Sequence, residues 1–307
     1  MLTLADGHVG PLVTVIVRTK NSRDTIAQAL NGLFSQTFQD FELLVVDSGS
    51  TDGTLDVVSS YPCEILRIEA HEYYPGPVLN RAIARSATPV VVLQNSDVVP
   101  LGVHALERLL EPLRSGRAQA SFARQRPRPE AHTWVRADYE RAFPAQGPAP
   151  AWLPYSLPLA AMLKSSWLDQ PFYDDAWGSE DTEWGTRARE RGIRIEYVPE
   201  AEVMHSHNYT LAQLYGRRFI EGEADAFIVP RPHSALATLG RLAGSLKSDL
   251  EAHLKAGDLR GILASPGRRA VYHWAYHKGR RLGERRARTG DRDASTGQKV
   301  VLDRYEA

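Results

Sequence analysis

Carboxylates, amides and hydroxyls of types that bind polar ligands follow three apolar runs of the chain. The runs are Leu12–Val17, Leu43–Val46 and Val90–Leu93, and each predicts a strand buried on both faces of a parallel sheet. Open α/β sheets bind ligands beyond the carboxyl ends of their strands, so the polar residues after these runs should line one crevice. These residues are Thr19 and Asn21, Asp47, and Asn95 and Asp97.

The segment that follows Asp47, Ser48–Gly53, consists of small, turn-forming residues. Ser50 or Thr51 could cap a helix that begins near Thr54. A carboxylate beside such a loop suits a nucleobase or a ribose better than a bare phosphate. An ordinary strand-to-helix turn, with Asp47 in an Asx-turn, explains the same residues. Neither GxGxxG nor GxxxxGK followed by Ser or Thr comes after a strand, which argues against a dinucleotide dehydrogenase and a P-loop enzyme.

Two adjacent carboxylates, Glu180 and Asp181, form a second centre of chemistry. Ser179 precedes them and is a residue type that caps helices, so both carboxylates should lie in a first helical turn. The helix dipole favours negative charge there, and this preference alone could explain them. Trp177 and Gly178, an aromatic and a flexible residue directly before the pair, favour a functional role.

His205 and His207 form a His-x-His pair. In an extended segment the two imidazoles point the same way, so one of them could ligate a metal ion. An ordinary polar pair on the surface or in the core is the alternative.

The composition excludes several classes of protein. Lys+Arg and Asp+Glu both total 37, so no net charge favours nucleic acid as a partner. The single cysteine, Cys63, excludes an intramolecular disulfide and a multi-cysteine zinc site, and it fits a reducing cytoplasm. The first residues lack the features of a signal peptide, and no run of about 18 apolar residues occurs. We therefore expect a cytoplasmic protein that is neither secreted nor membrane-spanning.

Helical and extended patterns alternate over residues 12–229, which predicts an α/β fold with a mostly parallel, Rossmann-like sheet flanked by helices. A helix is expected over Leu101–Arg114 and a strand over Ile193–Val198. The residues of Arg124–Pro158 predict a long ordered loop with a short helix at Ala137–Phe143.

From residue 230 the composition changes, which predicts a helical, basic extension over residues 230–290 and a flexible tail over residues 291–307. Leucines recur there at spacings of three and four, which predicts an amphipathic helix that packs on its own domain. They are Leu236, Leu239, Leu242, Leu246, Leu250 and Leu254. Arginines are then interleaved with Tyr272, Trp274 and Tyr276. This pattern fits either a solvated basic face or contact with a membrane surface.

Four motifs, in order, resemble the inverting nucleotide-sugar glycosyltransferases of family 2, which have the GT-A fold. They are VTVIVRTKN, FELLVVDSGSTDG, GPVLNRAIARSATPVVVLQNSD and WGSEDTEWGTRARERG. HEYYPGPVLN, RADYERAFP and HSHNYTL look most like bacterial rhamnosyltransferase-type members. The resemblance implies a GT-A domain over residues 1–229, with a nucleotide-binding half over about 12–100 and an acceptor half over about 101–229.

The resemblance also implies a role for each matching residue. Asp47 would contact the nucleobase, and Asp181 would be the catalytic base, with Glu180 beside it. Asn95 replaces the first carboxylate of the family's Asp-x-Asp, which leaves Asp97 to bind Mg²⁺ or Mn²⁺ with His205 or His207. Thr19, Asn21, Asn80 and Arg81 would complete the donor pocket, and Trp177 and Gly178 would meet the acceptor.

The implied reaction moves a sugar, with inversion, from a UDP-, dTDP- or GDP-linked donor to a hydroxyl of a glycan or lipid-linked acceptor. Surface polysaccharide synthesis, at the inner face of the membrane and without nucleic acid as a partner, is the expected setting. A catalytically inactive nucleotide-sugar-binding protein is the alternative, because Asn95 departs from the metal motif. A nucleotidyltransferase would need a basic, Gly-rich triphosphate loop near the first strand, and none is apparent.

Overall fold

The computed structural model describes residues 12–174, 178–229 and 233–290, which divide into two compact units. Unit 1 comprises residues 12–126, 142–174 and 184–205. Unit 2 comprises residues 127–141, 178–183, 206–229 and 233–290. Unit 2 thus contains residues on both sides of residue 229.

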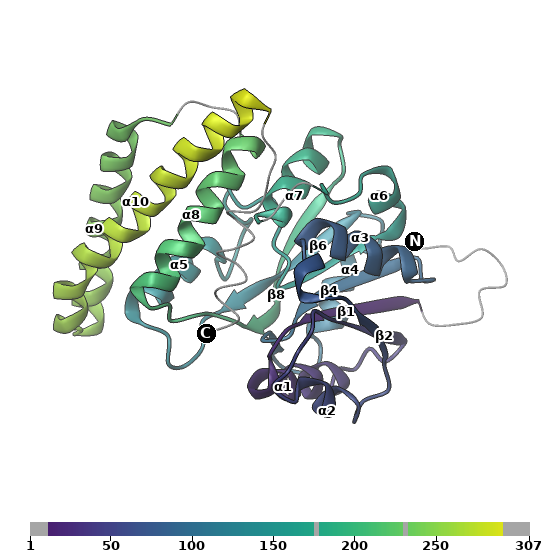
Figure 1. Ribbon diagram of the computed structural model, residues 1–307. Coiled ribbons are helices and arrows are strands. Elements are labelled where there is room, and N and C mark those ends of the chain that lie inside the picture. Colours follow the sequence, from purple (N-terminus) through teal and green to yellow (C-terminus); the bar gives the residue numbers. More distant parts are fainter. Residues whose placement is uncertain (1–11, 175–177, 230–232, 291–307) are drawn as a thin grey trace. The chain divides into compact units, whose positions relative to one another are not determined.

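Unit 1 is built on one eight-stranded sheet (Figure 1). Its strands are β1 (Val13–Thr19), β2 (Phe41–Asp47), β3 (Glu64–Arg67), β4 (Val90–Asn95), β5 (Val99–Pro100), β6 (Ala120–Arg126), β7 (Leu159–Leu163) and β8 (Ile195–Met204). The order across the sheet is β3-β2-β1-β4-β7-β6-β8-β5. β3, β2, β1 and β4 run parallel, as do β6 and β8, whereas β7 is antiparallel to both of its neighbours and β5 to β8. The expected mostly parallel sheet is confirmed.

The helices of unit 1 cover the sheet because the strands bury apolar side chains on both faces. On one face Val15 packs in a cluster with Leu30 and Leu109. Ile16 and Leu44, which alternate with the residues of that cluster, are equally buried and point to the other face. The α-helices are α1 (Arg23–Phe34), α2 (Thr54–Val58), α3 (Pro75–Arg85), α4 (Ala105–Arg114), α6 (Lys164–Asp169) and, from Trp184 on, α7 (Glu180–Glu190). This burial on both faces explains the continuous apolar runs in the sequence.

Some elements differ from the sequence expectations. Neither Ser50 nor Thr51 caps α2; the N-cap is Gly53, in a left-handed conformation, and Asp52 Oδ1 accepts the N–H of Thr54 at 2.9 Å. α4 begins at Ala105 because the residues before it form β5 and a turn. β8 continues six residues beyond Val198, through Pro199, with a register shift in its pairing to β6. Such an irregularity accommodates a residue that cannot donate to the sheet.

Unit 2 is helical. Its helices are α5 (Thr133–Ala142), the first turn of α7 (Glu180–Glu190), α8 (Leu211–Ile228), α9 (Ala235–Ala256) and α10 (Leu259–Thr289). α5 is the short helix expected inside the long loop, and it begins four residues earlier than Ala137. None of the helices in the described part of the chain has the length and apolarity that crossing a membrane requires.

Glycines bring α8 and α10 into close contact. A Cβ at Gly279 would lie 2.0 Å from the carbonyl oxygen of Phe219, and one at Gly222 would lie 2.2 Å from that of Tyr276. No side chain fits at either position. The extension after residue 230 is therefore held against α8 at backbone distance, which makes α10 an integral part of unit 2.

The leucine helix does not pack as expected. Leu236, Leu239, Leu250 and Leu254 are exposed on α9, whereas its buried residues are Thr238, Asp249 and His253. The polar face of α9 contacts α10 instead: Asp249 accepts from Arg269 Nε at 2.8 Å, and Ser245 Oγ lies 2.8 Å from His273 Nε2. The expectation that the leucine stripe packs on its own domain is wrong for these four leucines, because polar pairs form the interface.

Part of the basic face expected on α10 is also internal. Arg269 is buried between Asp138 of α5 and Asp249 of α9, and Arg286 pairs with buried Glu223 of α8. Tyr272 and Tyr276 lie under the guanidinium of Arg218. These groups therefore form contacts between the helices of unit 2, and other residues of α10 face solvent.

Candidate functional site

Thr19 and Asp47 lie side by side at the carboxyl ends of β1 and β2, paired in the register of the sheet. Both are buried, and Thr19 Oγ1 and Asp47 Oδ1 have no hydrogen-bond partner among the described residues. The other carboxylate oxygen of Asp47 accepts the N–H groups of Gly49 and Ser50, both at 3.1 Å. Because buried polar atoms are normally paired, these two atoms mark a place where a ligand supplies the missing partners.

Asn21 ties two loops of this edge together. Its backbone N–H donates to Ser50 Oγ at 2.9 Å, and its Oδ1 accepts the N–H of Thr51 at 2.9 Å. Its φ of 46° is left-handed, which asparagine tolerates better than most residues. The predicted donor residue Asn21 thus acts on the site by fixing the loop that follows Asp47.

Asn95, at the end of β4, faces Arg18 across the sheet. Arg18 donates from its guanidinium to Asn95 Oδ1 at 3.3 Å. An amide at position 95 does not neutralise this guanidinium, whereas a carboxylate there would. Arg18 is a residue that sequence reasoning missed, although it lies in VTVIVRTKN directly before Thr19.

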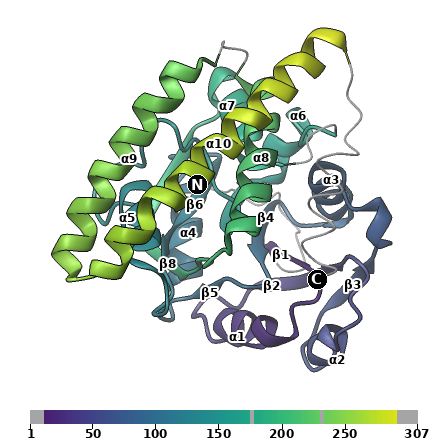
Figure 2. The same cartoon turned by 60° about the vertical axis from the view of Figure 1, so that its left-hand side comes forward.

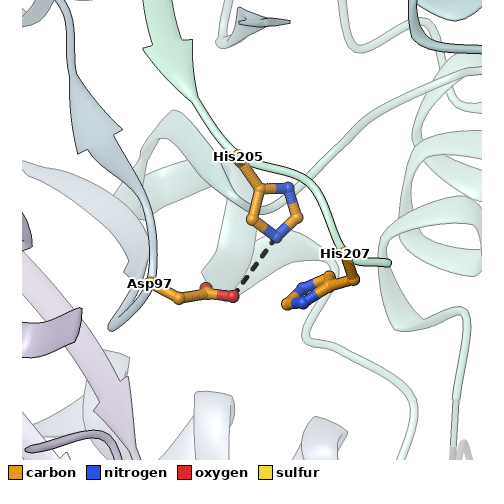
Figure 3. Close-up of side chains that lie close together, drawn as sticks. All are labelled: Asp97, His205 and His207. Atoms are coloured by element: carbon orange, nitrogen blue, oxygen red, sulfur yellow. Dashed lines mark ion pairs between the residues drawn. The ribbon is translucent and has the colours of Figure 1, made fainter. Parts of the chain in front are cut away.

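Asp97, His205 and His207 form a cluster of metal-ligating residue types (Figure 3). His205 Nε2 lies 3.6 Å from Asp97 Oδ2. His207 is two residues further along the same segment, and one ligand atom from each of the three residues lies within 4.8 Å of the others. One carboxylate and two imidazoles form a donor set that suits Mn²⁺ and other divalent metals, so the residues present fit the expected cofactor.

Gln125 fixes the orientation of His205. Gln125 Nε2 donates to Ser156 Oγ at 2.9 Å, so its Oε1 is left as an acceptor, 2.7 Å from His205 Nδ1. His205 therefore carries a proton on Nδ1, and its other nitrogen, Nε2, is the one that lies toward Asp97 and could ligate a metal ion. This is the arrangement of a metal-ligating histidine held by an outer hydrogen bond. Sequence reasoning missed Gln125, because nothing in the motif around β6 distinguishes it.

Asn80 and Arg81 do not join this group. Asn80 Nδ2 donates to the Phe172 carbonyl at 2.8 Å and to Asp174 Oδ1 at 2.9 Å. Its Oδ1 accepts from Trp167 Nε1 at 2.8 Å and from the Phe172 N–H at 2.9 Å. These four bonds use the full capacity of the amide, so Asn80 holds the chain and is not available to a donor. Arg81 is exposed on α3.

The predicted carboxylates Glu180 and Asp181 begin α7, in unit 2, and both are half-buried. Ser179 precedes them with a left-handed φ of 57°, and its carbonyl accepts the N–H of Glu183 at 2.9 Å. Gly178 has no room for a side chain, because a Cβ there would lie 2.8 Å from Ile220 Cγ2. Trp177, the other predicted acceptor residue, lies outside the described residues.

Arg217 of α8 brings a cation to Asp181. Although half of its side chain is exposed, the surrounding protein desolvates Arg217, which lowers its pKa. The interactions with Glu221, Tyr209 and Asp181 more than offset this effect and hold the pKa of Arg217 well above its usual value. Glu221 accepts from Arg217 Nε at 2.6 Å and also pairs with Arg218. Sequence reasoning missed Arg217 and Arg218.

Comparison with known proteins identifies a domain in this chain. Residues 14–162 match Glycosyl transferase family 2. The chain carries a family 2 glycosyltransferase domain, and the protein is a glycosyltransferase. It is 28% identical over 227 residues to the O-antigen chain rhamnosyltransferase WbaN of Salmonella anatum, covering 69% of this chain and 71% of the relative.

Solved structures show the same fold. The mannosyltransferase PcManGT of Pyrobaculum calidifontis, in complex with GDP-Man and Mn²⁺, has a TM-score of 0.55 and 19% identity, covering 96% of this chain and 86% of that one. Glucosyl-3-phosphoglycerate synthase of Mycobacterium tuberculosis, in complex with Mn²⁺ and UDP, has a TM-score of 0.55 and 20% identity, covering 73% and 82%. The GT-A fold that the motifs implied is confirmed, with helices present at the C-terminal end.

Proposed function

We propose that this glycosyltransferase moves a sugar, with inversion, from a nucleoside-diphosphate donor to a hydroxyl of a glycan or lipid-linked acceptor. The observation that carries the donor assignment is the pair of buried, unpartnered atoms Thr19 Oγ1 and Asp47 Oδ1. An unpaired carboxylate oxygen needs a hydrogen-bond donor, and the N–H of a uracil-type base or a ribose hydroxyl supplies one. Asp97 and His205 follow at the same edge of the sheet, where a diphosphate would extend.

Each residue of the site has its own proposed role in the reaction. Asp181 accepts the proton of the acceptor hydroxyl as that oxygen attacks the anomeric carbon, and one such base is enough for inversion. Asp97, His205 and His207 hold the metal ion, which supplies positive charge for the leaving diphosphate when it is bound. Arg217 orders the surroundings of Asp181 through Glu221. We do not assign Trp177 a role beyond the expected acceptor contact.

The similarity to WbaN favours a deoxyhexose donor and an acceptor in O-antigen-like polysaccharide synthesis. We propose that the protein acts in the cytoplasm and that its C-terminal helices contact the membrane that carries such an acceptor. A second candidate, a nucleotide-sugar-binding protein without turnover, is favoured only by the amide at Asn95. Release of nucleoside diphosphate that requires both donor and acceptor separates the two candidates.

The donor assignment is tested by thermal shift with UDP-, dTDP- and GDP-sugars in MnCl₂, followed by titration of Asp47→Asn with the free nucleoside of the best ligand. The asparagine keeps an oxygen for Gly49 and Ser50 but places an amide donor at the position of Asp47 Oδ1, which we propose accepts from the base. Nucleoside affinity should fall about tenfold or more, because a buried donor then faces the donor of the base. Asp56→Ala, an exposed carboxylate on α2, serves as the matched control. Unchanged nucleoside affinity in a folded Asp47→Asn protein contradicts the assignment.

A further inference from the structure

The outward side of α9 is apolar although its inward side is polar. Leu236, Leu239, Leu250 and Leu254 are exposed, and Leu236 exposes 79% of its surface. They recur at helical spacing and therefore share one side of α9. The contacts of α9 leave that side open: Asp249 and Ser245 face α10, and Ser248 is bonded by Arg141 of α5.

α10 continues this apolar surface. Leu259, Leu263 and Trp274 are exposed and follow one side of the helix, with Leu263 exposing 83% of its surface. α8 packs on another side of α10, through Gly279 and Gly283. Figure 2 shows α9 and α10 side by side. α5 bonds to both helices, through Asp138 to Arg269 and through Arg141 to Ser248. α5 and α8 thus lie behind the pair, and the exposed leucines and Trp274 form one outer face.

The same outer face becomes cationic toward the end of α10. Lys278, Arg281 and Arg285 are exposed at the spacing that continues the line of Leu263 and Trp274. Lys278 lies over the Trp274 ring, with Nζ 5.4 Å from its centroid. The one acidic residue of α10, Glu284, is directed to Arg280 and to the backbone of His233. The outer face therefore combines leucines, an interfacial tryptophan and cations.

We propose that this outer face lies on the surface of an anionic lipid bilayer, with the leucines and Trp274 inserted at the headgroup level. Helices that lie in a membrane interface have this composition, an apolar side with Trp and Leu bordered by Lys and Arg. The charge pattern decides against a second copy of this chain as the occupant. The exposed cations Lys278, Arg281 and Arg285 would find no exposed acid on the α10 of another copy, whereas an anionic surface complements them.

This membrane contact rests on the proposed function, which supplies the reason for it. The residues that make the contact differ from those expected from the sequence. The arginines that suggested a basic membrane face include Arg269 and Arg286, which are buried in ion pairs. The leucine stripe, which was expected to pack inward, supplies the contact. Lipid binding should accordingly depend on leucines as well as on charge.

The experiment is co-sedimentation of the full chain with phosphatidylcholine vesicles and with vesicles containing phosphatidylglycerol. The full chain should partition to the anionic vesicles. Each partition is measured at low and at high salt. Leu239→Ser combined with Leu263→Ser should lower the partition coefficient at least about tenfold at both salt concentrations, because less apolar surface is inserted. Lys278→Ala combined with Arg281→Ala should lower it about fivefold for each cation removed, and only at low salt. Leu168→Ser, at a leucine of α6 that exposes 63% of its surface, is the matched control and should change nothing.

Two further measurements keep the outcomes distinct. Thermal shift with the best nucleotide sugar should be the same for the leucine variant and the unmodified protein, because these leucines are remote in sequence from the donor residues of unit 1. A donor response without vesicle binding overturns the lipid inference, and with it the proposed membrane contact, but leaves the proposed sugar transfer from a nucleotide donor standing. The solution mass of the lipid-free protein is the second measurement: a dimer that the leucine substitutions convert to a monomer shows that a second copy covers the outer face. Equal partition of the leucine variant and the unmodified protein also overturns the inference.

Discussion

The Nε2 atom of His205 lies 3.6 Å from Oδ2 of Asp97, in a pair that is mostly shielded from solvent. The proton of His205 is held on the opposite nitrogen by Gln125. An imidazole nitrogen and a carboxylate oxygen at this separation can bind one cation between them. We propose that the two residues are ligands of one metal ion.

Substitution of Asp97 tests this role. Asp97→Ala should weaken donor binding at least about tenfold in Mn²⁺, and much less in EDTA, because the carboxylate acts through the metal. Isothermal titration with the nucleotide sugar under both conditions measures the difference. Asp40→Ala, an exposed carboxylate before β2, is the control. An equal loss of affinity with and without metal would remove Asp97 from the metal site.

Gln125 should affect metal binding although it does not ligate the metal itself. Gln125→Leu removes the acceptor that holds His205 Nδ1–H, and loss of such an outer partner typically weakens metal binding about 10- to 100-fold. Gln125→Glu retains an acceptor oxygen and should restore most of the affinity. Direct Mn²⁺ titration, followed by electron paramagnetic resonance of the free ion, measures this independently of turnover. If Gln125→Leu binds Mn²⁺ as tightly as the unmodified protein, the orientation of His205 does not depend on Gln125.

The sheet and its ligand edge could be predicted because their signals are local. A continuous apolar run such as Leu43–Val46 is compatible with few structures other than a doubly covered strand, and Asp47 follows it directly. The side chains of Asn80 and Gln125 could not be assigned in this way. Their roles depend on partners 92 and 31 residues distant, Phe172 and Ser156, and no spacing in the sequence reports such pairs.

Which side of α9 faces inward could not be predicted from the sequence, for a related reason. A period of three to four residues shows that leucines share one side of a helix, but it does not show which side is covered. Asp249 can be buried without a large free-energy cost because Arg269 and Ser265 donate hydrogen bonds to its carboxylate oxygens. Those partners lie on the next helix, so only the tertiary structure reveals that the polar side is the inner one.

The buried His273 of α10 predicts a dependence of stability on pH. Burial, and then the cations Arg218, Arg269 and Arg241, lower its pKa to about 4, while Asp249 opposes them. The unfolded chain binds a proton near pH 6.5 and the folded chain does not, so between these values stability is lost as the pH falls. The loss amounts to at most about 1.4 kcal/mol per pH unit from this group.

His273→Gln should remove that contribution while keeping a polar partner for Ser245. The variant should lose less stability than the unmodified protein when the pH is lowered from 7 to 5, as measured by urea unfolding with a helical signal. His71→Gln, at an exposed histidine of unit 1, is the control. If both variants follow the same pH profile as the unmodified protein, His273 is protonated in the folded state and the inferred burial effect is absent.

Asp181 carries the chemical step of the proposed reaction, and its neighbour Glu180 provides a matched comparison on the same helical turn. Asp181→Asn retains the shape and the acceptor for the Thr182 N–H, now bonded at 2.8 Å, but it cannot take up a proton. Turnover should fall about 10²- to 10⁴-fold, the usual cost of losing a general base, while the donor binds with nearly unchanged Kd. Glu180→Gln should reduce kcat much less, because that side chain supports the start of α7. The measurements are kcat for both variants and donor Kd by titration. Near-normal turnover in Asp181→Asn, or a collapse confined to Glu180→Gln, would place the base on the other carboxylate.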